Sequence, residues 1–262
     1  RASAIIFTSN QSIGPLDTAY DGADIVISNC TVTMDGAHSF NSLLVTNGGV
    51  LTHSYFPGGS ATLMFNVTNE PRVLTGTNPV ALLQSNVTAV LSVTDSGGTV
   101  IYTNGVDYML ANPGDGTTQI YRTETSSIPD GATVLVNYTW SYVVAAGLVV
   151  TVSNDVTIAS GGSIIANGIG YGGGQGNGRG YFSYVSPISG SGAGHGGYGG
   201  YSTNGANIGS CYGSLYQPVT LGSGGGQSYA GSGGSGGGRI QIAAGGNISI
   251  DGLISATGAD AT

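Results

Sequence analysis

Three histidines are the residues of this chain best suited to proton transfer, and their spacing matches no catalytic arrangement. They are His38, His53 and His195. The segment GSGAGHGG (190–197) brings Ser191 close to His195, but neighbours in sequence cannot form a catalytic triad by themselves. No Gly-X-Ser-X-Gly elbow places a serine before a helix. We therefore expect His38 and His53 to bond to backbone near the corners of a β structure, and His195 to pack within its glycine-rich surroundings.

Five aspartates are candidates for acid–base or metal chemistry, because solenoid enzymes that cut polysaccharides use clustered carboxylates or a basic residue beside calcium. They are Asp17, Asp21, Asp24, Asp35 and Asp251. Asp35 and Asp251 each precede a glycine at the end of a strand-like segment, where local hydrogen bonding favours aspartate in a turn. Asp17, Asp21 and Asp24 are close enough to share a calcium ion, although their spacing is not that of an EF-hand. We predict no catalytic residue, and calcium at these three aspartates is the one cofactor hypothesis.

Two cysteines, Cys30 and Cys211, lie far apart in the sequence. They form either one disulfide closing a very long loop in an oxidising compartment, or two free buried thiols. No CxxC or HxxxH spacing predicts a metal site. Asn-X-Ser/Thr sequons, the acceptor pattern for N-glycosylation, fit a secreted surface. Six of them occur, at Asn10, Asn29, Asn66, Asn86, Asn137 and Asn247.

The charge of the chain excludes several classes of partner. The net charge is −8, there is no lysine, and charged residues make up 7% of the chain, against about 25% in typical domains. Nucleic acid and anionic membrane surfaces require clustered Lys and Arg, which are missing here. A phosphate-binding GxxxxGK[ST] loop is excluded for the same reason. No run of 18 apolar residues predicts membrane insertion.

The polar surface must come from Ser, Thr, Asn and Gly, which leave sheet edges unguarded by charge. Such a surface fits a protein that assembles or sits in a matrix, and it fits a soluble secreted domain as well.

Alternating aliphatic residues predict an all-β chain in three regions. Region 1–58 has short alternating segments at close spacing, and region 146–262 repeats that rhythm twice. Recurrence of one strand-turn unit predicts one parallel β-helix built from both regions. The positions expected to face its core are Ile25/Ile27, Val32/Met34, Leu43/Val45, Val50, Val150/Val152, Val156/Ile158, Ile164/Ala166, Ile240/Ile242, Ile248/Ile250 and Ile254/Ala256.

Region 59–145 interrupts this rhythm with longer alternating segments and turn signals such as Pro129-Asp-Gly. This is the pattern of antiparallel hairpins, for which a compact β-sandwich of about seven strands is the natural solution. Within region 146–262, residues 168–237 are rich in glycine and tyrosine. They form an ordered excursion packed on the solenoid, or parallel polyproline-II-like glycine helices, or a disordered segment; the interleaved aromatic residues argue against disorder.

Several motifs resemble secreted glycine-rich β-helix modules of large bacterial surface proteins. These are DGADIVISNCTVTMDGAHSFNSLLVTNGGVLTHS, AGHGGYGGYS, CYGSLYQPVTLGSGGG and GGSGGGRIQIAAGGNISIDGLISATG. The resemblance covers residues 1–58 and 146–262 and implies a right-handed parallel β-helix in a surface or matrix protein, with no catalytic residue to carry over. The middle region departs from it and resembles an immunoglobulin-like module of bacterial and phage surface proteins.

The sequence therefore predicts a non-enzymatic, extracellular structural protein, with copies of the chain as partners in a head-to-tail filament or surface layer. The strand-like segment Ala4-Ile5-Ile6-Phe7 is expected to pair with a neighbouring copy. A carbohydrate-binding adhesin module that recognises surface polysaccharide is the second hypothesis. A polysaccharide-degrading β-helix enzyme that depends on Asp21 or Asp24 is the third.

Overall fold

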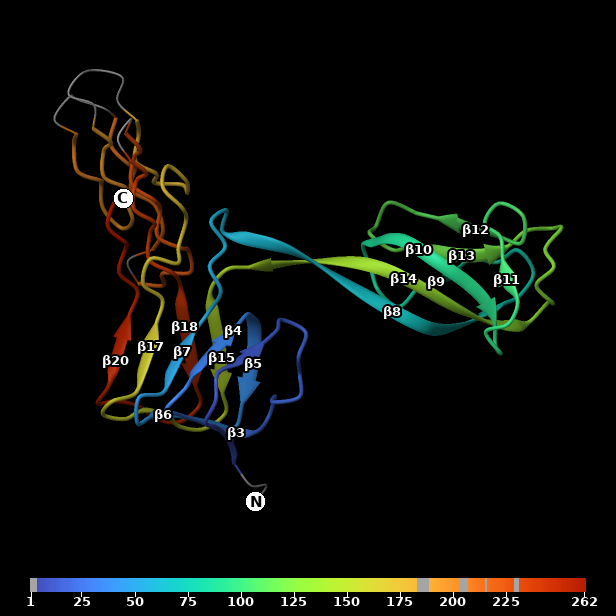
Figure 1. Cartoon of the computed structure of the whole chain (residues 1–262), viewed down its shortest axis with the longest axis horizontal. Coiled ribbons are helices and arrows are strands. Elements are labelled where there is room, and N and C mark those ends of the chain that lie inside the picture. Colours follow the sequence, from blue (N-terminus) through green and yellow to red (C-terminus); the bar gives the residue numbers. More distant parts are fainter. Residues whose placement is uncertain (1–3, 183–188, 203–206, 215, 229–230) are drawn as a thin grey trace. The chain divides into compact units, whose positions relative to one another are not determined.

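In the computed structural model, the regular elements of the described residues are all β-strands, which confirms the all-β prediction. The structure describes residues 4–182, 189–202, 207–214, 216–228 and 231–262. No helix able to cross a membrane is found among these residues. The chain divides into two compact units (Figure 1), which we name the parallel unit and the antiparallel unit. The first comprises residues 1–61 and 144–262, and the second comprises residues 62–143.

The parallel unit contains three sheets in which every pairing of strands is parallel. Sheet A has the order β1 (Ile5–Phe7), β3 (Asp24–Ser28), β6 (Ser42–Thr46), β16 (Val156–Ile158) and β19 (Ile248–Ile250). Sheet B has the order β2 (Gln11–Ile13), β4 (Thr31–Met34), β7 (Val50–Thr52), β17 (Ser163–Ile165) and β20 (Leu253–Ser255). Sheet C has the order β5 (Gly36–Phe40), β15 (Leu148–Val152) and β18 (Ile240–Ala244).

Successive strands visit these sheets in a fixed order, so the unit is built in layers. The strands β5, β6 and β7 pass through sheets C, A and B, and β15–β17 and β18–β20 do the same. Parallel pairing places equivalent residues beside one another, so that Leu43, Val156 and Ile248 form one column and Val45, Ile158 and Ile250 form the next. The buried members of these columns belong to one continuous core.

One predicted core position is wrong by a single residue. Leu51, and not Val50, is fully buried in β7. The cause is the turn before the strand, where the N–H of Gly49 donates to the carbonyl of Thr46 and fixes which side chains face inward. A β-carbon at Gly49 would lie 2.3 Å from the carbonyl oxygen of Ile27 in the layer below, so only glycine allows this approach.

Both long insertions leave the layers at the same corner, between sheets B and C. The antiparallel unit lies between β7 and β15, and the glycine-rich tract lies between β17 and β18. The first insertion is closed at its base by a hydrogen bond from Ala146 N to Gly59 O, of 2.9 Å, and the second by one from Gly238 N to Ala166 O, of 2.7 Å. An insertion at a corner leaves the column pairing intact.

The antiparallel unit consists of two sheets around its own core. The four-stranded sheet has the order β11 (Ile101–Tyr102), β10 (Val87–Asp95), β14 (Ala132–Ala145) and β8 (Ser60–Leu74). The three-stranded sheet has the order β12 (Tyr108–Ala111), β13 (Gln119–Arg122) and β9 (Val80–Ala81). Side chains from both sheets meet in one buried cluster that includes Ile120, Val136, Tyr138 and Trp140.

The described residues between Gly168 and Gly238, here called the glycine lattice, form no sheet of named strands yet are joined by backbone hydrogen bonds. Extended segments run side by side (Figure 1), with bonds such as Gly170 N to Gly236 O (2.8 Å) and Gly199 N to Gly209 O (3.0 Å). A β-carbon at Gly199 would lie 2.0 Å from the carbonyl oxygen of Gly192. Glycine is therefore required here because backbones touch backbones.

The adjacent residues Gly199 and Gly200 offer a direct test of this packing. A β-carbon at Gly200 would meet nothing within 4 Å. We expect Gly199→Ala to destabilise the lattice by about 1–3 kcal/mol through overpacking, and Gly200→Ala to be neutral or stabilising by less than about 1 kcal/mol. Amide hydrogen exchange of the lattice glycines measures both effects. Equal protection in the two variants would contradict the close packing at Gly199.

Candidate functional site

The last layer of the parallel unit presents core-type side chains to the outside. Ile248 and Ile250 stand in the columns of Val156 and Ile158, which are fully buried, yet they are 49% and 51% exposed. Leu253 and Ile254 of β20 are 54% and 38% exposed. In the part of the chain that the structure describes, no strand pairs with the outer edges of β18, β19 and β20. We call the surface formed by Ile248, Ile250, Leu253 and Ile254 the open end.

The opposite end of the layers is partly covered. Phe7 of β1 packs edge-on against Tyr20, with 5.2 Å between ring centroids. The segment 14–23 runs along the edge of β5, where Gly22 N donates to Ser39 O at 2.8 Å. The two ends of the parallel unit are therefore different surfaces.

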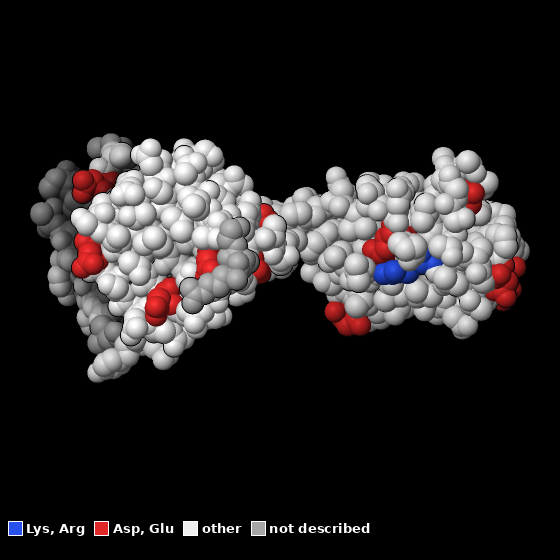
Figure 2. All heavy atoms as spheres, turned by 90° about the horizontal axis from the view of Figure 1, so that it is seen from below, with Lys and Arg blue, Asp and Glu red and all other residues white. Residues whose placement is uncertain are grey.

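Charged residues make up 7% of the chain and are sparse on its surface. On the face seen in Figure 2, acidic side chains are scattered over a mostly uncharged surface. Large surfaces without charge allow strand edges and apolar side chains to make contacts with other molecules.

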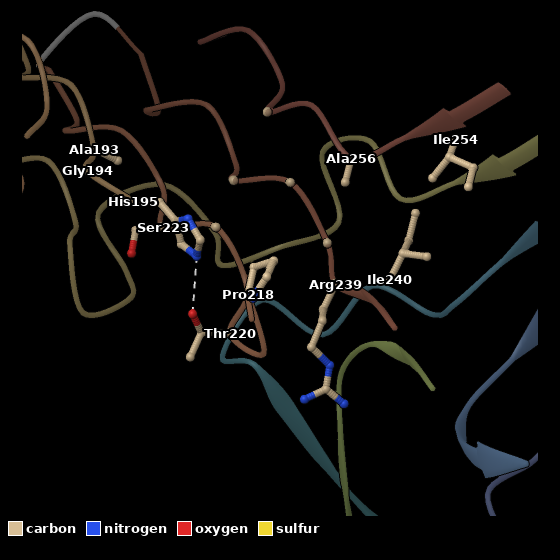
Figure 3. Close-up of a pocket in the computed structure, with 15 residues that line it drawn as sticks. Ala193, Gly194, His195, Pro218, Thr220, Ser223, Arg239, Ile240, Ile254 and Ala256 are labelled. Atoms are coloured by element: carbon tan, nitrogen blue, oxygen red, sulfur yellow. Dashed lines mark hydrogen bonds between the residues drawn. The ribbon is translucent and has the colours of Figure 1, made fainter. Parts of the chain in front are cut away.

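A hollow of about 560 Å³ lies where the glycine lattice meets β18 and β20 (Figure 3). Ile240, Ile254 and Ala256 line one side of it, and His195 and Thr220 belong to the lattice side. The Nε2 atom of His195 lies 3.1 Å from the Thr220 hydroxyl, and its ring packs edge-on against Tyr212 at 4.8 Å. A histidine beside a hydroxyl is the simplest base–nucleophile pair. Among the described residues, no carboxylate is paired with His195 to orient its ring.

Arg239 extends from the wall of this hollow towards Gly147 and holds the insertion corner. Its Nη1 donates to the carbonyl of Val219 at 2.9 Å, and its buried Nε has no hydrogen-bond partner. A β-carbon at Gly147 would lie 2.7 Å from that Nε, so the guanidinium packs directly on glycine backbone. Burial lowers the pKa of Arg239. This arginine links the base of the glycine lattice to β15 in the layer below.

His38 and His53 bond to backbone carbonyls, as the sequence predicted. The Nε2 of His38 lies 3.1 Å from Asp35 O, and the Nδ1 of His53 lies 2.8 Å from Ser54 O. Ser54 in turn donates to both carboxylate oxygens of Asp35 through its N–H (2.9 Å) and hydroxyl (2.6 Å). Burial lowers the pKa of His53, partly opposed by its bond to the Ser54 carbonyl. These contacts fix the corner at which both insertions leave.

The three aspartates predicted to share calcium each have local partners. Asp17 accepts from Ala19 N at 3.0 Å, and Asp21 accepts from Ser39 N at 3.2 Å and lies 3.5 Å from His38 Nδ1. The Oδ1 of Asp24 accepts 2.6 Å bonds from Asn41 and Ser42. Among the described residues, no group of three or more His, Cys, Asp or Glu side chains is arranged to hold a metal ion.

The two cysteines are free, so the alternative of two thiols holds and the disulfide is not formed. Cys30 is buried in the core of the parallel sheets, and its thiol donates to the carbonyl of Phe7 at 3.3 Å. Cys211 is exposed on the glycine lattice. The expectation that both thiols are buried is wrong for Cys211.

Five of the six sequon asparagines are exposed, which are Asn10, Asn29, Asn66, Asn86 and Asn247. Asn137 differs, because its side chain bonds at both ends. Its Oδ1 accepts from Asn69 N at 2.6 Å, and its Nδ2 donates to Ser92 Oγ at 2.8 Å. A glycan on that Nδ2 would compete with the bond to Ser92. The predicted assembly strand, Ala4 to Phe7, provides β1, whose inner edge pairs with β3 and whose outer edge has no strand partner among the described residues.

Sequence reasoning missed a buried charged cluster in the antiparallel unit. Glu70 is 5% exposed and accepts from the Tyr138 hydroxyl, from Leu83 N at 2.8 Å and from Arg72, whose Nη2 lies 2.5 Å away. A buried carboxylate needs several such donors to offset its desolvation. Glu70 and Tyr138 are 68 positions apart in the chain. The one sequence signal for the cluster was the isolated pair of charges at Glu70 and Arg72 in an otherwise uncharged segment.

No family model matches this chain, and comparisons with curated proteins and with solved structures find no match either. A function for this chain must therefore be inferred from its own structure.

The Tyr138–Glu70 contact generates a prediction about pH. Burial, assisted by the bond to Glu70, raises the pKa of Tyr138 from 10.0 to about 12. The unfolded chain then ionises at lower pH than the folded chain, so stability is retained below pH 10 and lost as the pH rises towards 12. We expect the free energy of unfolding to fall by about 2–3 kcal/mol over this interval. Urea unfolding followed by the fluorescence of Trp140, the single tryptophan, measures it.

Tyr138→Phe is the matched variant, because it removes the titrating hydroxyl and keeps the ring. Burial also raises the pKa of Tyr102 and Tyr108, so part of the alkaline loss should remain. An alkaline loss of unchanged size in Tyr138→Phe would show that Tyr138 is not responsible.

Proposed function

We propose that this chain is an extracellular structural protein whose copies join end to end into filaments or a surface layer. The open end carries this proposal, because Ile248, Ile250 and Ile254 occupy core columns and no described strand covers them. A further layer stacked on β18–β20 would continue those columns. The first layer of a second copy, with β1 in sheet A and β2 in sheet B, supplies strands in the same two sheets.

We infer that sheets A, B and C together form one right-handed parallel β-helix. The fixed order in which the chain visits the sheets supports this, as do the continuous columns of aliphatic side chains. The inserted antiparallel unit is proposed to be an immunoglobulin-like sandwich, since seven antiparallel strands enclose one core. In this view the helix is the scaffold and the sandwich is the displayed module.

An extracellular location fits the surface of the molecule. Five sequon asparagines are exposed, and the charged content of 7% without lysine suits a protein that assembles rather than one that stays dispersed. A contact between two different ends does not close on itself, so it builds filaments instead of dimers.

The apolar contact alone is too small to drive assembly. Completing the burial of three half-exposed isoleucines contributes about 3 kcal/mol in total, whereas association loses about 4–15 kcal/mol of translational and rotational freedom. Backbone pairing must therefore contribute. The free edges of β18, β19 and β20 offer it by strand addition, in which main-chain hydrogen bonds supply affinity and side-chain columns supply register.

We expect the purified chain to form particles whose length grows with concentration, which electron microscopy and sedimentation velocity across a dilution series will measure. Replacing Ile248 and Ile250 together by Asp should weaken self-association by at least about 10-fold, because two unpaired carboxylates would enter the apolar contact. Deleting residues 1–8 should act in the same direction by removing β1 from the other surface.

The matched control is the double variant Leu91→Asp/Ile101→Asp, which changes the net charge equally at exposed apolar positions of the antiparallel unit. It should assemble like the unmodified chain. A monomer at every concentration would refute the assembly proposal. Assembly that survives both the open-end variant and the deletion would place the contact elsewhere.

A further inference from the structure

A second hollow, of about 360 Å³, opens on the glycine lattice and is lined by polar, basic and aromatic side chains. Its walls are glycine backbone together with Gln175, Arg179, Tyr181, Phe182 and Gln227. None of the residues that line it is acidic. We call it the Arg179 hollow.

Arg179 is a cation without a counter-ion in the described chain. Arg72 pairs with Glu70 and Arg122 pairs with Asp130, whereas Arg179 makes no ion pair with any described residue. Its guanidinium lies over the ring of Tyr181, 5.6 Å from the ring centroid. Stacking on an aromatic ring holds the planar guanidinium in place and leaves its outward N–H groups free to bind a carboxylate through two hydrogen bonds.

Two amide side chains line the same hollow and make few hydrogen bonds to the described chain. Within the described chain, the amide of Gln175 makes no hydrogen bond, and that of Gln227 makes one long contact of 3.4 Å from Nε2 to Gly173 O. Each primary amide offers two donors and one acceptor. Together they suit a ligand with several hydroxyl groups.

The glycine backbone gives the hollow a fixed shape. A β-carbon at Gly173 would lie 2.2 Å from Gly233 O, and one at Gly180 would lie 2.1 Å from Ser191 O. Both walls are thus pressed against neighbouring lattice segments. The backbone of the hollow is therefore closely packed, whereas the side chains of Gln175, Arg179 and Gln227 are exposed and would lose rotamer freedom when they bind a ligand.

We propose that the Arg179 hollow binds an acidic saccharide of the uronic-acid class. The carboxylate of the sugar would accept from the guanidinium of Arg179, and its ring hydroxyls would bond to the amides of Gln175 and Gln227. Tyr181 is a positioning residue that holds the guanidinium by its ring. This binding is a property of a single chain and is separate from end-to-end assembly.

Isothermal titration calorimetry with trigalacturonic acid tests the proposal on the full chain, with maltotriose as the neutral sugar and tripolyphosphate as the non-sugar anion. We expect trigalacturonic acid to bind, to bind more weakly as salt is added, and to bind more tightly than either comparison ligand. Arg179→Gln should weaken binding by at least about 10-fold. Arg122→Gln removes the same charge in the antiparallel unit, outside the lining of the hollow, and should leave binding unchanged.

The role of Tyr181 is tested by two further variants. Tyr181→Leu should weaken binding about two- to fivefold, and Tyr181→Phe, which keeps the ring, should restore it. Absence of binding by trigalacturonic acid, equal binding of maltotriose or of tripolyphosphate, or unchanged binding by Arg179→Gln would each overturn the proposal. If trigalacturonic acid still binds to the Ile248→Asp/Ile250→Asp variant, the Arg179 hollow is independent of the proposed filament contact.

Discussion

Stacking of parallel strands in register is the constraint on which the parallel unit depends. A strand covers the inward side chains of its neighbour from one side only, so a residue is fully buried only between two layers. Ile158 lies between Val45 and Ile250 and is completely buried, whereas Ile250 has a neighbour on one side and is half exposed. The same kind of side chain is thus buried in the core or exposed on the surface according to its position in the stack. The open end follows from this geometry and not from an unusual sequence.

The glycine lattice is stabilised by a different kind of contact from the parallel sheets. The parallel sheets bury aliphatic side chains between layers, while the lattice brings backbone against backbone and satisfies its polar groups laterally, as between Gly170 and Gly236. Its tyrosines divide accordingly. Tyr212 is partly buried and bonds to Leu221 O and to Ser223, whereas Tyr198 and Tyr201 are 76% and 80% exposed. Because backbone contacts hold much of the lattice, some of its side chains are not needed for packing, and Arg179 is one that makes no ion pair with any described residue.

Features that repeat along the sequence, such as the alternating strands, could be predicted, whereas single contacts between distant residues could not. Alternating aliphatic residues identified the all-β class and nearly every inward position, because a period of two leaves a clear pattern. The exception at Leu51 depended on the geometry of the turn at Gly49. Glycine carries no pattern, so no reading of the tract could have paired Gly199 with Gly209. The bond between Tyr138 and Glu70 was equally hidden, because each residue by itself looks like an ordinary strand position.

The corner between sheets B and C explains how two insertions can interrupt one stack. The layer β5–β7 must stack on the layer β15–β17 although a whole unit separates Thr52 from Leu148 in the chain. An unstructured loop of that length would add only about 0.6 kcal/mol for each doubling of length, but it would leave its own apolar surface exposed. The antiparallel unit instead has its own core, and its first and last strands, β8 and β14, are neighbours in one sheet. Gly59 and Ala146, at the two ends of the insertion, are held together by the hydrogen bond from Ala146 N to Gly59 O. The two ends of the insertion thus lie side by side, and an insertion of this kind can be large without disturbing the pairing of the parallel layers.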